Sequence, residues 1–424
     1  MQHRNYRKTA NGNNNGAAHA AAMVDLTLYN ALRAVFIEEA FCAQALTKAL
    51  KGLNNIRSHP FVTVAFYGVL DNNVRFNKII DSLCENAPDK NSAVVLKIGL
   101  FYCRYADMPD YAAVDRTVEL AKKVGAFSGF VNAVLKKSIG YEVKFRSALE
   151  KFSYDTNTPE WLCKEMISDY GESRAAAILG AALPQRTHIR PVLKRITLEQ
   201  FYATADGGIK TDYGSYVERS TLDRFAPGTY AVQSISSIRA VNTYKNGIDG
   251  GDVIDLCAAP GGKSVYLSEL GDYRITACDI YPHKLDLMRG YAKKLGAKIN
   301  VALNDATRIN NEYVGAFDIV IADCPCSGTG TLKTKPDILI KRKPSDIDEL
   351  TELQRKILYA ASKYCKVGGT LCYSTCSVLR SENEEQTERF IKEHAEYTLL
   401  DETKLLPDTD KCDGFYIARF KRER

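Results

Sequence analysis

The sequence predicts an all-α bundle, then a small α/β subdomain, then an α/β domain with a mostly parallel sheet. Two observations predict this order. Apolar residues recur at spacings of three and four through the first third of the chain, and from Gly250 short apolar runs alternate with helical stretches. The length of 424 residues leaves room for two or three domains. The composition, 45% hydrophobic and 25% charged, is that of an ordinary globular protein.

Composition also excludes some classes of protein. No stretch approaches the roughly 20 apolar residues that a membrane-spanning helix needs. The N-terminus is polar and Asn-rich from Asn11 to Asn15, unlike a secretory signal. Twelve cysteines in so long a chain do not form a small disulfide framework, so we expect mostly reduced thiols. We therefore expect a cytoplasmic protein with no membrane partner.

The positive charge of the chain is unevenly placed. Residues 1–150 hold 19 Lys and Arg against 13 Asp and Glu, whereas residues 151–424 hold 38 of each. A surplus confined to the first third suggests a polyanionic partner for that region. A solvated surface of modest charge explains the same numbers almost as well.

The first two predicted regions follow from local patterns. Residues 1–22 are rich in Asn, Gly and Ala, which predicts a disordered tail. Residues 23–150 predict the helical bundle, because apolar positions such as Val24, Leu28 and Leu32 fall on one helix face, and the same spacing returns further on. Residues 151–230 mix alternating runs with Gly-Gly and Pro-Gly turns, which predicts the small α/β subdomain and linker.

Residues 231–424 predict the α/β domain. Strands are expected at Val253–Cys257, Ile275–Asp279, Ile299–Leu303, Asp318–Asp323 and Thr370–Ser374. Helices are expected at Leu285–Leu295, Leu350–Lys363 and Asn383–Glu393. Such an alternation predicts a parallel sheet covered on both faces, with ligands bound at the carboxyl ends of its strands.

The first motif runs from Asp255 to Lys263, with the sequence DLCAAPGGK. Its small residues and Gly pair let the backbone approach a ligand, and a helix N-terminus follows. Asp279 and Asp305 end the next two strands, where one suits ribose hydroxyls and the other an adenine amino group. The motif matches neither the phosphate P-loop nor the G-x-G-x-x-G fingerprint. A nucleotide-like cofactor explains the three features together, whereas a tight turn with surface carboxylates explains the Gly pair alone.

The second and third motifs are Asp323–Gly330 and Tyr373–Ser377, each closing a strand. They predict that Cys326 and Cys376 lie near each other. Zinc would need four ligands, and Cys-x-Cys beside a proline is poor chelate geometry even if Cys324 and Cys372 are counted. A redox pair would be expected to have Cys-x-x-Cys spacing. Nucleophilic catalysis by a thiol whose pKa is lowered at a strand end fits best.

These three motifs, in this order, resemble those of the Sun/Fmu family of RNA (cytosine-5-)-methyltransferases, the bacterial RsmB type acting on 16S ribosomal RNA. Residues Arg116–Lys136 resemble the end of the NusB-like helical domain fused to these enzymes, and Asp413–Tyr416 resembles their closing strand. The resemblance implies a NusB-like, RNA-binding N-terminal domain and a Rossmann-like catalytic domain that binds S-adenosylmethionine.

The resemblance also implies roles for single residues. Cys376 matches the nucleophile, Cys326 the second cysteine linked to product release, and Asp323 the carboxylate between cofactor and target base. Asp279 would hold the ribose and Asp305 the adenine side of the cofactor. The residues that would line its methionine and ribose region are Cys257, Ala258, Ala259, Pro260, Gly261, Gly262 and Lys263. Cys324 stands where Ala is more usual in the family.

The implied function is S-adenosylmethionine-dependent methylation of cytosine C5 in 16S ribosomal RNA through a covalent Cys–C6 intermediate. The partner would be the RNA rather than the fully assembled subunit, and the enzyme would be a monomer without a metal. The basic run Lys333, Lys335, Lys341, Arg342 and Lys343 would offer phosphate contacts. Two alternatives stay open: methylation of another substrate such as transfer RNA, and a non-enzymatic RNA-binding or antitermination-type protein.

Overall fold

The computed structural model describes residues 14–424, and these form two compact units. One unit contains the described residues up to Ile167 together with Lys335–Arg342, and the other contains Ser168–Thr334 and Lys343–Arg424. Within residues 14–424, no helix is long and apolar enough to cross a membrane.

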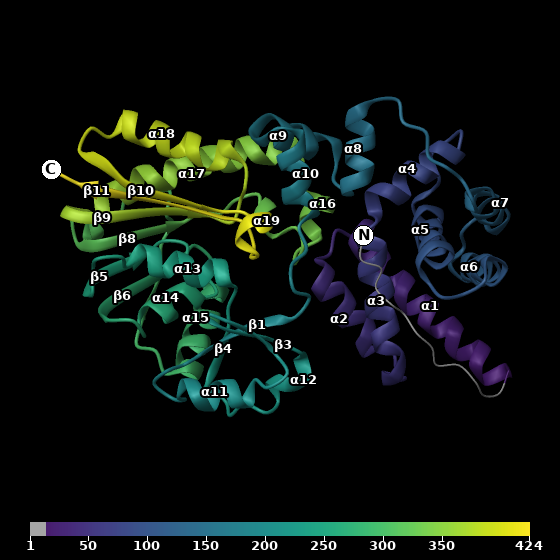
Figure 1. Cartoon of the computed structure of the whole chain (residues 1–424), viewed down its shortest axis with the longest axis horizontal. Helices are drawn as coiled ribbons and strands as arrows, with labels where there is room; N and C mark the ends of the chain where they lie inside the picture. The colour runs from purple at the N-terminus through teal and green to yellow at the C-terminus, as the bar shows by residue number, and fades with distance from the viewer. Residues whose placement is uncertain (1–13) are drawn as a thin grey trace. The chain divides into compact units, whose positions relative to one another are not determined.

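The first unit is all-helical, as predicted (Figure 1). Its helices are α1 (Asn14–Phe36), α2 (Cys42–Lys51), α3 (His59–Leu70), α4 (Asn73–Leu83), α5 (Lys90–Tyr105), α6 (Asp110–Val124), α7 (Ser128–Ser138), α8 (Ala148–Thr156) and most of α9 (Glu160–Tyr170). Helix α5 is central, and Val95, Leu96 and Ile98 are completely buried in its core. The side chain of Asp89 caps this helix by accepting hydrogen bonds from the backbone of Asn91 and Ser92.

Helix α1 extends into the segment, residues 1–22, for which the sequence predicts a disordered tail. Residues 1–13 lie outside the described part of the chain, but helix α1 already begins at Asn14. The segment that follows Asn14 contains Ala17, Ala18, Ala20, Ala21 and Ala22. Because Ala is the best helix former, this run extends the helix despite its lack of bulky apolar residues.

A buried ion pair lies inside the helical unit. Arg116 on α6 donates to both carboxylate oxygens of Asp25 on α1, at 2.7–2.9 Å, and Tyr102 on α5 donates to the same carboxylate at 2.6 Å. The guanidinium of Arg116 also lies over the ring of Tyr102. Three helices are thereby joined through one satisfied carboxylate.

A segment from late in the sequence also belongs to the helical unit. Helix α16 (Asp337–Lys341) places Asp337 Oδ1 2.7 Å from the backbone nitrogen of Cys42, at the start of α2. Lys341 donates to the backbone oxygen of Glu39 at 2.7 Å and lies 4.0 Å from the ring centre of Phe41. Lys341 is thus engaged in the helical unit, which was not expected of a residue in a basic run offered to phosphates.

The second unit begins with α10 (Glu172–Gly180) and a small antiparallel sheet of four strands in the order β2-β3-β1-β4. Its elements are β1 (Thr187–Pro191), α11 (Leu198–Thr204), β2 (Ile209–Thr211), β3 (Gly214–Val217), α12 (Arg219–Leu222) and β4 (Tyr230–Val232). This is the small α/β subdomain that the turn pattern predicts.

The larger sheet has seven strands in the order β10-β11-β9-β8-β5-β6-β7. The strands are β5 (Gly250–Asp255), β6 (Asp272–Asp279), β7 (Asn300–Leu303), β8 (Phe317–Asp323), β9 (Cys365–Thr375), β10 (Tyr397–Leu405) and β11 (Phe415–Arg422). Strands β9, β8, β5, β6 and β7 are parallel, whereas β11 pairs antiparallel with both β9 and β10. The predicted strands are therefore confirmed, and β10 is an addition that the sequence analysis did not predict.

Helices cover both faces of this sheet (Figure 1). On one face α17 (Pro344–Tyr364) and α18 (Glu384–Glu393) bury Ile357 and Phe390 against the strands. On the other face α13 (Ile235–Tyr244) and α14 (Gly262–Leu267) bury Val241 and Leu267, with α15 (Pro282–Leu295) beside them. The remaining short helix, α19 (Pro407–Asp410), precedes β11. The strand order changes direction between β5 and β8, which places the expected ligand site at their carboxyl ends.

Candidate active site

The two predicted thiols lie together. Cys326 follows β8 and Cys376 follows β9, which are neighbouring parallel strands, so both side chains reach the same edge of the sheet. Their sulfur atoms are 3.2 Å apart, and the backbone nitrogen of Cys376 donates to Cys326 Sγ at 3.3 Å. Both residues are partly exposed.

The neighbouring thiol and burial both affect the protonation of Cys326. The hydrogen bond to Cys376, together with burial, raises the pKa of the Cys326 thiol well above its ordinary value. At Cys326 the neighbouring sulfur and the low-dielectric surroundings therefore oppose the lowering of a thiol pKa that is expected at a strand end. Either thiol can be the donor in the hydrogen bond between the two sulfur atoms.

Asp323, at the end of β8, connects residues from the first and third motifs. Its Oδ2 lies 2.6 Å from Lys263 Nζ, and its Oδ1 accepts from Ser374 Oγ at 2.8 Å. Ser374 is in turn 2.5 Å from the hydroxyl of Tyr244 on α13. Burial opposes the charge on Lys263, but the Asp323 carboxylate outweighs it and raises the pKa of Lys263. Tyr244 carries no sequence signal for this contact, because it lies in an ordinary helical pattern.

Close backbone packing fixes the second motif. Gly330 donates its N–H to the backbone oxygen of Cys376 at 2.9 Å and accepts from the backbone nitrogen of Gly414 at 2.8 Å. A Cβ atom at Gly330 would lie 2.2 Å from the backbone oxygen of Gly414, so only glycine fits there. The Asp323–Gly330 motif is thus locked against both the third motif and the loop before β11.

The first motif forms the turn that its composition predicts. Gly261 precedes α14 with a φ of 100°, a conformation that favours glycine. Asp255, at the end of β5, is buried and accepts from Ser264 Oγ at 2.6 Å. Burial raises the pKa of Asp255 to about 7. Its other oxygen, Oδ1, is buried and finds no hydrogen-bond partner among residues 14–424.

The two further carboxylates stand at adjacent strand ends. Asp279 ends β6 and is buried, with Oδ1 accepting from the backbone nitrogen of Tyr281 at 3.1 Å and Oδ2 lying 3.4 Å from Lys284 Nζ. Asp305 follows β7 and accepts from the hydroxyl and backbone nitrogen of Thr307, which lowers the pKa of Asp305. Between them Asn304 is buried, and its Nδ2 has no partner within the described chain.

The strand-end carboxylates and the unpartnered amide of Asn304 fit a nucleoside cofactor. A carboxylate at Asp279 suits two ribose hydroxyls, which are donors, and the unpartnered amide of Asn304 suits a purine nitrogen, which is an acceptor. No group of three or more His, Cys, Asp or Glu residues in the described chain is arranged to hold a metal ion. The fold and these strand-end groups define a methyltransferase that uses S-adenosylmethionine.

Comparison with known proteins gives the particular family. A family model for the 16S rRNA methyltransferase RsmB/F matches residues 244–421, and one for the NusB family matches residues 23–139. A probable ribosomal RNA small subunit methyltransferase B from Bacillus subtilis is 30% identical, covering 85% of this chain and 90% of its own. Ribosomal RNA small subunit methyltransferase B from Xanthomonas campestris is 28% identical, covering 91% and 94%. This chain belongs to the RsmB/F methyltransferase family, with a NusB domain at its N-terminal side.

The solved structures agree on the fold. The crystal structure of PH0851 superposes with a TM-score of 0.79 at 21% identity, covering 95% of this chain and 98% of that one. The family matches confirm the resemblance noted from the motifs and the S-adenosylmethionine cofactor, and the solved structure agrees with the fold class.

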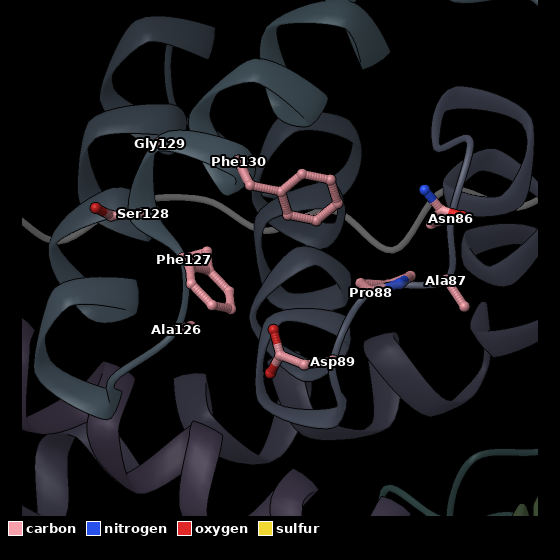
Figure 2. Close-up of a pocket in the computed structure, with 9 residues that line it drawn as sticks. All are labelled: Asn86, Ala87, Pro88, Asp89, Ala126, Phe127, Ser128, Gly129 and Phe130. Atoms are coloured by element: carbon pink, nitrogen blue, oxygen red, sulfur yellow. The ribbon is translucent and has the colours of Figure 1, made fainter.

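A separate pocket lies in the helical unit. It has a volume of about 660 Å³ and is lined by residues 86–89 and 126–130. Figure 2 shows the rings of Phe127 and Phe130 directed toward the segment that carries Pro88. Phe127 is 71% exposed, which is unusual for an aromatic side chain of this size.

Proposed function

We propose that this chain methylates C5 of a cytosine in 16S ribosomal RNA, with Cys376 forming a covalent bond to C6 of the base. The observation that carries the proposal is the 3.2 Å separation of the Cys326 and Cys376 sulfur atoms beside the Asp323 carboxylate. Cytosine C5 is a poor nucleophile, and addition of a thiolate at C6 converts C5 into an enamine-like carbon. S-adenosylmethionine supplies the electrophilic methyl group when it is bound.

The cofactor contacts are assigned to the polar groups at the strand ends, of which the Asn304 amide has no partner in residues 14–424. We assign the ribose to Asp279, the adenine side to Asn304 and Asp305, and the methionine and ribose region to Cys257–Lys263. Support comes from the position of all these residues at the carboxyl ends of β5, β6 and β7.

Asp323 and Lys263 would orient the base and stabilise its developing charge. Each Asp323 oxygen accepts one hydrogen bond, from Lys263 or from Ser374, and keeps a second lone pair that can accept from the cytosine amino group. Lys263 is the adjacent cationic donor for negative charge that spreads over the ring as Cys376 adds.

Cys326 would act when the product is released. In the free pair its pKa is raised first of all by the hydrogen bond with Cys376. Once Cys376 Sγ is bonded to carbon, that hydrogen bond is lost and the pKa of Cys326 falls, so Cys326 can release its own proton to solvent and then take the C5 proton as a thiolate. Loss of this proton then expels Cys376 as a thiolate and restores the aromatic ring.

The test compares two cysteine variants on purified 16S ribosomal RNA and on transfer RNA, with methylation mapped by bisulfite sequencing. Cys376→Ala should lower turnover by roughly 10³-fold or more, since it removes the group that makes the covalent bond. Cys326→Ala should leave a denaturant-resistant protein–RNA adduct that the double variant lacks. Turnover by Cys376→Ala, or methylation of transfer RNA alone, would remove this assignment.

We further propose that the helical unit supplies RNA affinity. Residues 1–150 carry the positive surplus of the chain, and the pocket in Figure 2 exposes aromatic rings on which unpaired bases can stack. The target base must leave its stack to enter the active site, so single-stranded or flexible RNA is the favoured substrate.

A further inference from the structure

Two neighbouring residues, Glu382 and Asn383, form hydrogen bonds with the residues that flank Cys326 and Cys376. Glu382 ends a short 3-10 helix, η4 (Arg380–Glu382), and Asn383 immediately precedes α18. Both side chains are fully buried, at 0% exposure. A buried carboxylate is costly unless each oxygen is hydrogen-bonded, so the partners of Glu382 indicate what it holds.

Glu382 holds the loop that carries Cys326. Its Oε1 accepts from the backbone nitrogen of Ser327 at 2.7 Å, and its Oε2 accepts from Ser327 Oγ at 2.5 Å. Gln354 on α17 completes the arrangement, because its Nε2 donates to Glu382 Oε1 and to the backbone oxygen of Pro325, both at 3.0 Å. The residues on either side of Cys326 are thereby fixed, while its thiol is left to face Cys376.

Asn383 holds the loop that carries Cys376 in the same way. Its Oδ1 accepts from Thr375 Oγ1 at 2.5 Å, and its Nδ2 donates to the backbone oxygen of Ser377 at 3.0 Å. Again the two residues that flank the cysteine are fixed. Because Glu382 and Asn383 are adjacent in sequence, the two loops are tied to one point of the backbone.

We propose that Glu382 and Asn383 are positioning residues that set the distance between the two thiols, Glu382 acting on Cys326 and Asn383 on Cys376. This inference rests on the proposed function for its catalytic consequence, but the geometric part stands on the hydrogen bonds alone. Since misplacing a reacting group by about 1 Å can cost roughly 100-fold in rate, the pair would matter to turnover without touching the RNA.

The role of each residue predicts a different defect. Loss of the Glu382 side chain misplaces Cys326, so elimination should fail and the covalent protein–RNA adduct should accumulate. Loss of the Asn383 side chain misplaces Cys376, so addition should fail and turnover should fall without an adduct. A merely structural role for the pair would not separate the two defects in this way.

The first experiment measures thiol geometry without the reaction. Each variant is equilibrated with reduced and oxidised glutathione, in which two thiols and one glutathione disulfide give the Cys326–Cys376 disulfide and two glutathione thiols, and the linked peptide is quantified by mass spectrometry. Glu382→Ala and Asn383→Ala should lower the effective concentration of the pair by roughly 10-fold to 100-fold. Glu385→Ala, an exposed neighbour on α18, is the matched control and should change nothing.

The second experiment measures turnover, adduct and S-adenosylmethionine affinity for the same proteins. We expect lower kcat with unchanged cofactor affinity, adduct only for Glu382→Ala, and partial rescue by Glu382→Gln, which keeps one acceptor. Ser327→Ala, which removes a single donor, gives a milder test if the alanine variants fail to fold. Thiol exchange equal to that of Glu385→Ala in folded variants overturns the inference. A changed exchange without any RNA adduct in any variant would instead contradict the covalent mechanism.

Discussion

The two units differ in how completely a buried carboxylate is hydrogen-bonded. In the helical unit, both oxygens of Asp25 are taken up by Arg116, and Tyr102 adds a third donor. In the methyltransferase unit, Asp255 is as deeply buried, yet one of its oxygens has no partner in residues 14–424, and its pKa is raised to about 7 by burial. A closed network stabilises a fold, whereas unused hydrogen-bonding capacity at a strand end indicates a place for a ligand.

The same substitution at these two carboxylates should therefore act in opposite directions. Asp25→Asn removes the counter-charge of Arg116 and should destabilise the helical unit by roughly 3 kcal/mol, because one member of a buried pair is left uncompensated. The measurement is urea unfolding of the full chain. Arg33→Ala, which breaks an exposed ion pair with Glu38, is the control and should cost less than about 1 kcal/mol.

Asp255→Asn should instead stabilise, and increasingly so as the pH rises. The carboxyl ionises near pH 3.8 in the unfolded chain but near pH 7 when folded, so between these values only the unfolded state has lost the proton. Folding stability of the parent therefore falls as the pH rises through this window, by about 1.4 kcal/mol per unit at most. Relative to the parent, the variant should gain about 2–3 kcal/mol between pH 5 and pH 7. A flat difference between those two pH values would show that Asp255 is already ionised in the folded protein.

The two carboxylates assigned to the cofactor, Asp279 and Asp305, should differ in their contribution to binding. Asp279→Ala should weaken S-adenosylmethionine binding by about 1.5–3 kcal/mol, the value of charge-assisted hydrogen bonds from ribose hydroxyls. Asp305→Ala should cost less, because the Asp305 side chain is 30% exposed against 8% for Asp279, so solvent screens its interaction with the cofactor more strongly. Calorimetric titration of both variants gives the comparison, and equal affinities for Asp279→Ala and the parent would place the ribose elsewhere.

The sequence predicted those parts of the site that are written into continuous motifs. Cys326 and Cys376 each follow an apolar strand, and the ends of neighbouring parallel strands meet, so their proximity could be inferred. The contacts among Asp323, Lys263 and Tyr244 could not, because they depend on how α13 and α14 pack against the sheet. In the sequence, Glu382 and Asn383 look like the polar first residues of a helix, so their hydrogen bonds to the residues that flank Cys326 and Cys376 could not be predicted either.

Regions with weak or misleading local patterns were harder still. Strand β10 (Tyr397–Leu405) is largely exposed at one edge of the sheet, and its residues Asp401, Glu402 and Lys404 obscure any apolar alternation. Helix α16 offers only five residues, and nothing local indicates that Ile340 packs against the core of the helical unit. Such assignments depend on long-range packing, which periodicity does not encode.

The smallest expected effect tests whether positive charge on the helical unit contacts RNA. Lys136 and Lys137 lie in the last turn of α7, and Lys293 and Lys294 lie in the last turn of α15 in the methyltransferase unit. All four are exposed, so the two pairs are matched in residue type and helix position.

If the helical unit contacts the RNA backbone through its pair, Lys136→Gln with Lys137→Gln should weaken binding uniformly across RNA sequences. It should also flatten the plot of log affinity against log salt by up to about 1.4, since each single-stranded phosphate contact contributes about 0.7. The α15 double variant should leave this slope unchanged. Equal slopes for both double variants and the parent would show that the positive residues of the helical unit are solvated and do not contact RNA. The helical unit would then act through its fold rather than its charge.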